Sequence, residues 1–234
     1  MVNKRKGSKT RRRLLEVAFG VIHRKGFQAA GLNEILEQAG LTKGAMYYHF
    51  GGKNALGYAV VEEIVGELIH ERWIAPLVSA EGDALTKIPR VMRSAAEEMD
   101  ESDIALGCPL GNLAAEMSAL DDGFAQRIDA IYQRWRDALA AAIVAGKADD
   151  DPQRIATFVV AAISGSLAQA KVLARRDILL NGITELEFFL HQSRTAAAKP
   201  PASEPPTEPP EPEPDSEPET TYAPPPAEME DYLL

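Results

Sequence analysis

Residues Gly31 to Lys53 read GLNEILEQAGLTKGAMYYHFGGK. Apolar residues in the first part recur at i, i+3, i+4 and i+7, which predicts a helix with one buried face. They are Leu32, Ile35, Leu36 and Ala39. Gly40 follows, where a tight turn requires the positive φ that glycine accepts, and Thr42 stands at the N-cap of a second helix. The stretch therefore predicts two short helices joined by a tight turn.

The second helix has two different faces. Met46 and Phe50 are four residues apart, so they share a face and form an apolar anchor. The rest of its surface is polar, cationic and aromatic, and consists of Lys43, Gly44, Tyr47 and Tyr48. A helix that packs on its partner with one side and presents such a surface on the other is typical of a recognition helix for the major groove of DNA.

The residues that follow and flank this helix add candidate DNA contacts. Tyr47 and His49 offer hydrogen bonds to phosphate oxygens, and Gly44 allows a close backbone approach to bases. Lys53 begins the next helix, where free amides and the helix dipole also favour an anion. Each residue alone is more often a turn, packing or structural residue. Their order, behind seven Lys and Arg residues in the first 13, favours DNA binding.

The segment from Thr42 to Phe50, with Lys53 after it, resembles the DNA-binding signature of the TetR family of bacterial transcriptional regulators. The resemblance covers roughly the first 55 residues and is more specific than a generic helix-turn-helix. One departure is Ala30-Gly31, where the family usually has Thr-Ser, so we leave both out of the site. The candidate DNA-binding residues are Thr42, Lys43, Gly44, Tyr47, Tyr48, His49 and Lys53.

The charge distribution is strongly asymmetric. The whole chain of 234 residues has a formal charge of −10, which taken alone argues against nucleic acid. Residues 1–53, however, carry +8, residues 54–199 carry −8, and residues 200–234 carry −10. The front of the chain is therefore a candidate for phosphate binding.

Apolar residues recur at helical spacing before Gly26 and after Lys53 as well, and no long stretch alternates with period two. We expect Gly26 and Pro76 each to end a helix. The stripe Phe124, Ile128, Ile131, Trp135, Leu139 and Ala142 predicts a further helix that ends at Gly146, and Asp151-Pro152 predicts the N-cap and first turn of the next one.

The sequence predicts an all-α fold with a three-helix helix-turn-helix domain and a helical C-terminal domain. We expect a basic disordered arm over 1–9, the DNA-binding domain over 10–53, and a ligand-binding and dimerisation domain over 54–197. Residues 198–234 hold 12 of the 16 prolines together with 10 acidic residues, which predicts a disordered tail. That tail is either a passive extension or a docking peptide.

Several function classes are disfavoured. The single cysteine, Cys108, excludes an internal disulfide or a multi-cysteine zinc site. The four histidines show no metal-ligand spacing, and no phosphate loop or nucleophile motif occurs, so we expect no cofactor and no enzyme. No secretory signal is present and no apolar run reaches the about 18 residues of a membrane span. These features favour a cytoplasmic protein.

The segment Gly107 to Glu116 resembles a GC-x-LGN-type stretch found in one subgroup of the family. Cys108 within it is either a small core residue, the commoner case, or a thiol that senses oxidants or electrophiles. Flexible or aromatic side chains on converging helical faces are weak candidates for a ligand pocket. These candidates are Met92, Met99, Leu106, Cys108, Met117, Tyr132 and Trp135.

The resemblance implies a dimeric regulator with a small-molecule inducer. Small residues over 163–170 and apolar residues over 183–190 favour a four-helix bundle formed by helices at about 152–176 and 178–192 with their copies. We expect a repressor that binds a palindromic operator as a homodimer and is released by a small molecule or electrophile. An activator or a global regulator of the same fold is the alternative.

Overall fold

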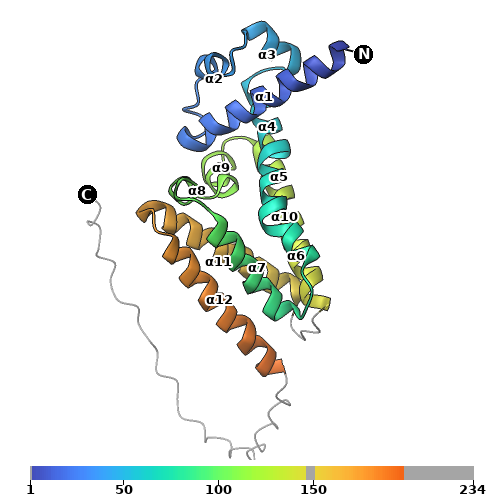
Figure 1. Cartoon of the computed structure of the whole chain (residues 1–234), viewed down its shortest axis with the longest axis vertical. Helices are drawn as coiled ribbons and strands as arrows, with labels where there is room; N and C mark the ends of the chain where they lie inside the picture. The colour runs from blue at the N-terminus through green and yellow to red at the C-terminus, as the bar shows by residue number, and fades with distance from the viewer. Residues whose placement is uncertain (1, 146–150, 198–234) are drawn as a thin grey trace, which may run out of the picture. The chain divides into compact units, whose positions relative to one another are not determined.

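The computed structural model describes residues 2–145 and 151–197, and every regular element in these two ranges is a helix (Figure 1). The predicted all-α fold is therefore confirmed. The predicted tail over 198–234 and the predicted helix end at Gly146 lie outside the described residues.

The N-terminal region consists of α1 (Val2–Lys25), α2 (Leu32–Ala39) and α3 (Lys43–His49). Gly26 closes α1 with φ +83°, and Gly40 ends α2 with φ +64°, both in the left-handed region. The amide of Gly40 donates to the carbonyl of Glu37. The predicted turn at Gly40 is confirmed, and glycine adopts this left-handed backbone conformation without strain.

The basic residues at the front belong to a helix. Since α1 begins at Val2, the prediction of a disordered arm over 1–9 is wrong for residues 2–9. Lys and Arg favour helix. Two arginines that follow these residues on α1 form ion pairs with glutamates about 50 residues later in the sequence. Arg11 contacts Glu63 at 2.5 Å and Arg12 contacts Glu67 at 3.0 Å. Part of the basic charge is thus matched by acids within the chain.

One continuous helical stretch follows, from Lys53 to Ser79. It consists of α4 (Lys53–Ala59), η1 (Val60–Val65), α5 (Gly66–Ile69), η2 (His70–Ile74) and α6 (Ala75–Ser79). The prediction that Pro76 stops this helix is wrong by one turn. Pro76 comes directly after the wide π-type turn of η2, at the start of α6, where its missing N–H is tolerated.

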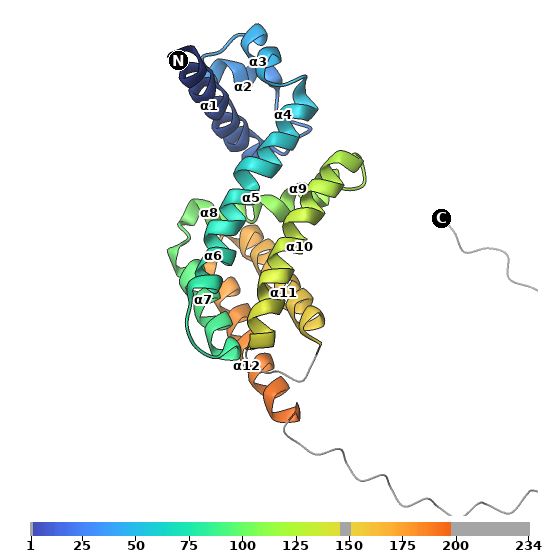
Figure 2. The same ribbon diagram turned by 90° about the vertical axis from the view of Figure 1, so that its right-hand side faces the viewer.

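The remaining helices are α7 (Ala84–Glu98), α8 (Glu101–Leu106), α9 (Pro109–Met117), α10 (Asp122–Ala145), α11 (Pro152–Leu173) and α12 (Arg176–Ala197). Helix α8 was not predicted from periodicity, because it has fewer than two turns. Helices α10 and α12 flank α11, and α12 also packs on α7 (Figures 1 and 2). Asp151 caps α11 through the amides of Gln153 and Arg154, as the Asp-Pro pair predicted.

By length and composition alone, α11 is apolar enough to cross a membrane. Seven of its residues are buried inside the protein: Ile155, Ala156, Val159, Val160, Ile163, Leu167 and Ala170. These buried positions, and its place between α10 and α12, identify it as a core helix.

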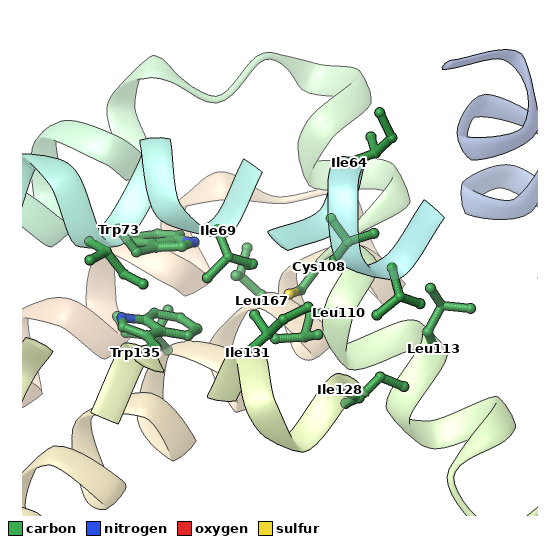
Figure 3. Packing of buried hydrophobic residues seen from close by; sticks show 14 of the residues in the cluster. Ile64, Ile69, Trp73, Cys108, Leu110, Leu113, Ile128, Ile131, Trp135 and Leu167 are labelled. Atoms are coloured by element: carbon green, nitrogen blue, oxygen red, sulfur yellow. The ribbon is translucent and has the colours of Figure 1, made fainter. Parts of the chain in front are cut away.

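The core of the C-terminal region is built on the predicted face of α10. Phe124, Ile128, Ile131, Trp135, Leu139 and Ala142 are all buried. The rings of Trp135 and Trp73 stack with centroids 5.6 Å apart, and Cys108, Leu110 and Leu167 pack beside Ile131 (Figure 3). This stacking joins α10 to η2.

Gly57 on α4 provides a first test of the packing. A β-carbon there would lie 2.4 Å from Cε2 of Phe27 and 2.7 Å from Cζ of Phe124. Because such overpacking costs about 1–3 kcal/mol, we expect Gly57→Ala to lower the free energy of unfolding by that amount in thermal or denaturant unfolding.

The matched control is Gly20→Ala on α1. Its β-carbon would meet only the flexible end of Arg24, at 3.4 Å. This substitution should leave stability unchanged or raise it by about 0.5–1 kcal/mol through helix propensity. Equal stability of the two variants would contradict the described packing of Phe27.

Candidate functional site

The second helix of the helix-turn-helix, α3, is stabilised by an N-cap at its start and by buried apolar residues on its inner face. The hydroxyl of Thr42 accepts a hydrogen bond from the amide of Ala45 at 3.2 Å, which confirms the predicted N-cap. Met46 is fully buried and Phe50 is 5% exposed. The guanidinium of Arg11 lies over the Phe50 ring, 4.9 Å from its centroid. Helix α3 therefore has a fixed orientation on α1 and α2 despite its two turns.

The opposite side of α3 faces solvent. Tyr47 is 56% exposed and Tyr48 is 83% exposed, although tyrosine usually buries much of its ring. Thr42, Lys43 and Gly44 are exposed as well. Six of the seven candidate DNA-binding residues thus lie on α3 or at its cap, and the exposed ones form one surface.

His49 and Lys53 are less open. His49 is half-buried, with its ring edge-on to Tyr48 at 5.0 Å. A β-carbon on Gly7 would lie 4.0 Å from its Cε1 atom, so the start of α1 runs beside the end of α3. Lys53 donates to the carbonyl of Gln28 at 3.1 Å and lies over the Phe27 ring. Its ammonium has three protons, so two stay available for a phosphate.

A cavity of about 120 Å³ lies between α1 and the C-terminal helices. It is lined by Phe19, His23, Leu68, Ile69, Arg72, Trp73, Met99, Asp103, Gly107, Cys108, Pro109 and Leu167. Most of the lining is apolar, with a few polar groups, as is usual for small-molecule sites. Because Phe19 and His23 belong to α1, a bound molecule there would touch the DNA-binding region directly.

Only two of the seven predicted pocket residues, Met99 and Cys108, line this cavity. Trp135 stacks behind the lining residue Trp73. Met92, Leu106, Met117 and Tyr132 do not line it, since periodicity identifies the buried face of a helix but not the gaps between helices. The lining residues that the sequence did not predict include Phe19, His23, Arg72 and Asp103, which come from helices far apart in the chain.

The polar groups of the cavity are already paired with one another or with backbone. His23 is half-buried, and burial lowers its pKa, so the ring is neutral and Nε2 donates to the carbonyl of Gly107 at 2.9 Å. Arg72 binds Asp103 at 2.7 Å. Within residues 2–145 and 151–197, no three His, Cys, Asp or Glu residues converge as metal ligands.

Cys108 caps α9. Its Sγ accepts a hydrogen bond from the amide of Gly111 at 3.4 Å, and the residue is 8% exposed. Burial raises the pKa of the Cys108 thiol, so the neutral thiol persists at neutral pH. Since the thiolate is the nucleophile, this conformation favours the packing role of Cys108 over the sensing role.

Two family descriptions match the chain. "Bacterial regulatory proteins, tetR family" matches residues 14–60, which contain α2 and α3, and "Transcriptional regulator LmrA/YxaF-like, C-terminal domain" matches residues 84–182. The second range includes the Gly107–Glu116 segment and all of the cavity lining that follows α6.

Relatives of the chain are similar over most of their own length. The HTH-type transcriptional repressor DhaR of Mycobacterium sp. strain GP1 is 26% identical, over 72% of this chain and 86% of DhaR. The HTH-type transcriptional repressor NemR of Escherichia coli K12 is 25% identical, over 80% of this chain and 96% of NemR.

Solved structures agree with this similarity. The reduced form of Escherichia coli NemR superposes with a TM-score of 0.69 at 26% identity, covering 76% of this chain and 95% of NemR. A TetR transcriptional regulator from Chloroflexus aurantiacus gives a TM-score of 0.71 at 26% identity, covering 80% of this chain and 97% of that one.

The capped second helix and its exposed aromatic surface are those of a helix-turn-helix transcriptional regulator, the class to which the relatives DhaR and NemR belong. Together with the two family matches and these relatives, they show that the chain belongs to the TetR family of bacterial transcriptional regulators.

The state of Cys108 is directly testable, because it is the only cysteine of the chain. We expect native protein to react with an aromatic disulfide reagent at least about 10-fold more slowly than unfolded protein at pH 7.5, since the thiol is buried and protonated. A native rate equal to the unfolded rate would favour the sensing role instead. Cys108→Ser serves as the blank.

Proposed function

We propose that the chain is a ligand-responsive transcriptional repressor that binds a palindromic operator as a homodimer. The observation that carries this proposal is the exposed surface of α3, where Tyr47 and Tyr48 stand on a helix anchored by Met46 and Phe50. Repression is favoured over activation because the relatives DhaR and NemR are named as repressors. A DNA-binding regulator of this kind acts in the cytoplasm.

The candidate contacts divide into two groups. Lys43 and Gly44 at the exposed start of α3, and Tyr48 near its end, are assigned to base edges in the major groove. Thr42, Tyr47, His49 and Lys53 are assigned to phosphates and fix the position of α3 on the duplex. We assign residues 10–53 to DNA binding and residues 54–197 to ligand binding and dimerisation.

Dimerisation is supported by an apolar surface on α11 and α12. Phe158 and Phe188 are 45% and 61% exposed, and the Phe158 ring contacts that of Phe189 with centroids 4.5 Å apart. Further along α11, Ala161, Gly165 and Ala168 are exposed and allow close helix approach. An exposed apolar surface of this kind favours association with a copy.

Release from DNA is assigned to the 120 Å³ cavity. A molecule bound there contacts α1 together with α8, α9 and α11. It would favour the conformation in which two α3 helices no longer match successive major grooves, about 34–36 Å apart or a multiple of that distance. Affinity for the operator then falls by population shift. The buried, protonated Cys108 favours a non-covalent molecule over an electrophile.

Genome-wide mapping of bound sites gives the operator for a binding test. Tyr47→Ala removes an exposed hydrogen-bonding group without touching the core, so we expect operator affinity to fall about 10-fold or more with the melting temperature unchanged. Gel-shift titration measures the affinity.

The matched control is Leu120→Ala, since Leu120 is similarly exposed (62%) but lies between α9 and α10. This variant should bind the operator like the parent protein. Unchanged affinity of Tyr47→Ala would refute the assigned role of α3.

The dimer is tested by placing a charge on its proposed surface. Phe188→Asp should give a monomer at micromolar concentration in analytical ultracentrifugation, because a buried unpaired carboxylate opposes association. Val78→Asp is the control, since Val78 on α6 is 72% exposed and outside the proposed surface. A monomeric parent protein would contradict the proposal.

A further inference from the structure

The turn after α1 holds a carboxylate from the C-terminal region. The amides of Phe27 and Gln28 each donate a hydrogen bond of 2.8 Å to Glu116, the first to Oε2 and the second to Oε1. In the sequence, Glu116 lies 89 residues after Phe27 and 88 residues after Gln28. Consecutive backbone amides that point the same way form a small concave site for an anion, and the side chain of Glu116 fills it.

Gly26 makes this arrangement possible. Its φ of +83° turns the following amides toward α9. A β-carbon at Gly26 would lie 2.8 Å and 2.9 Å from the two carboxylate oxygens of Glu116. The backbone conformation therefore requires glycine at this position, and a β-carbon there would also push the Glu116 carboxylate away from the two amides.

Helix α9 is attached to α1 at two points. Just before its start, the carbonyl of Gly107, the C-cap of α8, accepts a hydrogen bond from His23. At its end, Glu116 holds the amides of Phe27 and Gln28. Two attachment points fix the direction of α9 relative to the end of α1, whereas a single one would let α9 rotate about it.

The Glu116 contact differs from the other links between these regions. Arg11–Glu63 and Arg12–Glu67 join long side chains that are more than one-third exposed, and such pairs allow rearrangement. Glu116 instead binds main-chain amides through two charge-assisted hydrogen bonds, which are geometrically specific. A movement of the carboxylate consequently moves the backbone itself, and α2 begins only four residues after Gln28.

The same helix reaches the cavity at its other end. Cys108 and Pro109, which begin α9, line the cavity. Pro109, Asn112 and Glu116 follow at i, i+3 and i+7 and so share one face of α9. Asn112 braces this face by donating to the carbonyl of Leu106 at 2.9 Å and accepting from Lys171 at 3.1 Å. A helix of nine residues moves as a rigid unit, so displacement at Pro109 changes the position of Glu116.

We propose that Glu116 is the positioning residue through which α9 sets the orientation of the helix-turn-helix, and through which a molecule in the cavity reaches α3. The regulatory part rests on the proposed function. The positioning part does not, because it concerns only the geometry of α9 relative to α1 and α2.

The experiment measures that geometry without DNA or ligand. Spin labels are attached to Gln38→Cys on α2 and Gln126→Cys on α10, both at exposed positions, in a Cys108→Ser background. Serine keeps the N-cap of α9. Labelled protein is diluted with unlabelled protein, so that electron–electron double resonance reports the distance within one chain.

Glu116→Gln keeps the size of the side chain but retains one acceptor oxygen at most and loses the charge. The distance distribution should become at least twofold broader in this variant, with the melting temperature within a few degrees of the parent protein. The control Glu97→Gln removes an exposed charge on α7 and should leave the distribution unchanged. A role limited to local stability would lower the melting temperature without broadening the distances.

An unchanged distribution in Glu116→Gln overturns the proposal. If that variant does not fold, Glu116→Asp, which pulls the carboxylate away from the two amides, decides by the same criterion. The operator affinity of Glu116→Gln should also fall about fivefold. If the parent protein binds no operator but the distance distribution broadens in Glu116→Gln, the proposed function fails and the positioning role of Glu116 stands.

Discussion

Phe27 packs against Phe124 beside Gly57, and this contact connects the turn after α1 with helices α4 and α10. Phe27 follows α1, Gly57 lies on α4 and Phe124 begins the buried face of α10, and the two rings are 4.6 Å apart. Tyr58 adds an edge-on contact to Phe124 and donates to Asp121. Because aromatic packing of this kind is both apolar and directional, it holds the start of α4 and the turn after α1 against α10, and Glu116 then sets the orientation of that turn.

Helix α1 serves the DNA-binding region and the cavity at once. Its front carries Arg11, which covers Phe50 beneath α3 and pairs with Glu63. Its rear carries Phe19 and His23, which form part of the cavity wall. One end of α1 thus lies under the recognition helix and the other lies at the cavity, so α1 would offer a second short path for the proposed regulation, beside the Glu116 contact.

The sequence predicted the local features well. Thr42 caps α3, Gly40 takes a positive φ, Gly26 closes α1 and Asp151 caps α11, as residue type and spacing indicated. It predicted the buried stripe of α10 because a helical period reports burial directly. It failed at α8, which is too short for a period, and at the first residues of the chain, where α1 extends through a basic stretch that composition alone suggested was disordered.

The sequence by itself determined the class of fold and the recognition helix, because caps, turns and apolar spacing act over only a few residues. The tertiary structure alone decided where the cavity lies, which residues line it and what holds the helix-turn-helix. Phe19, Arg72 and Cys108 meet from three distant helices, and Glu116 binds two backbone amides that carry no side-chain signature. Contacts between residues nearly 90 positions apart depend on how the helices pack, and the spacing of residues that are close in the sequence does not report this packing.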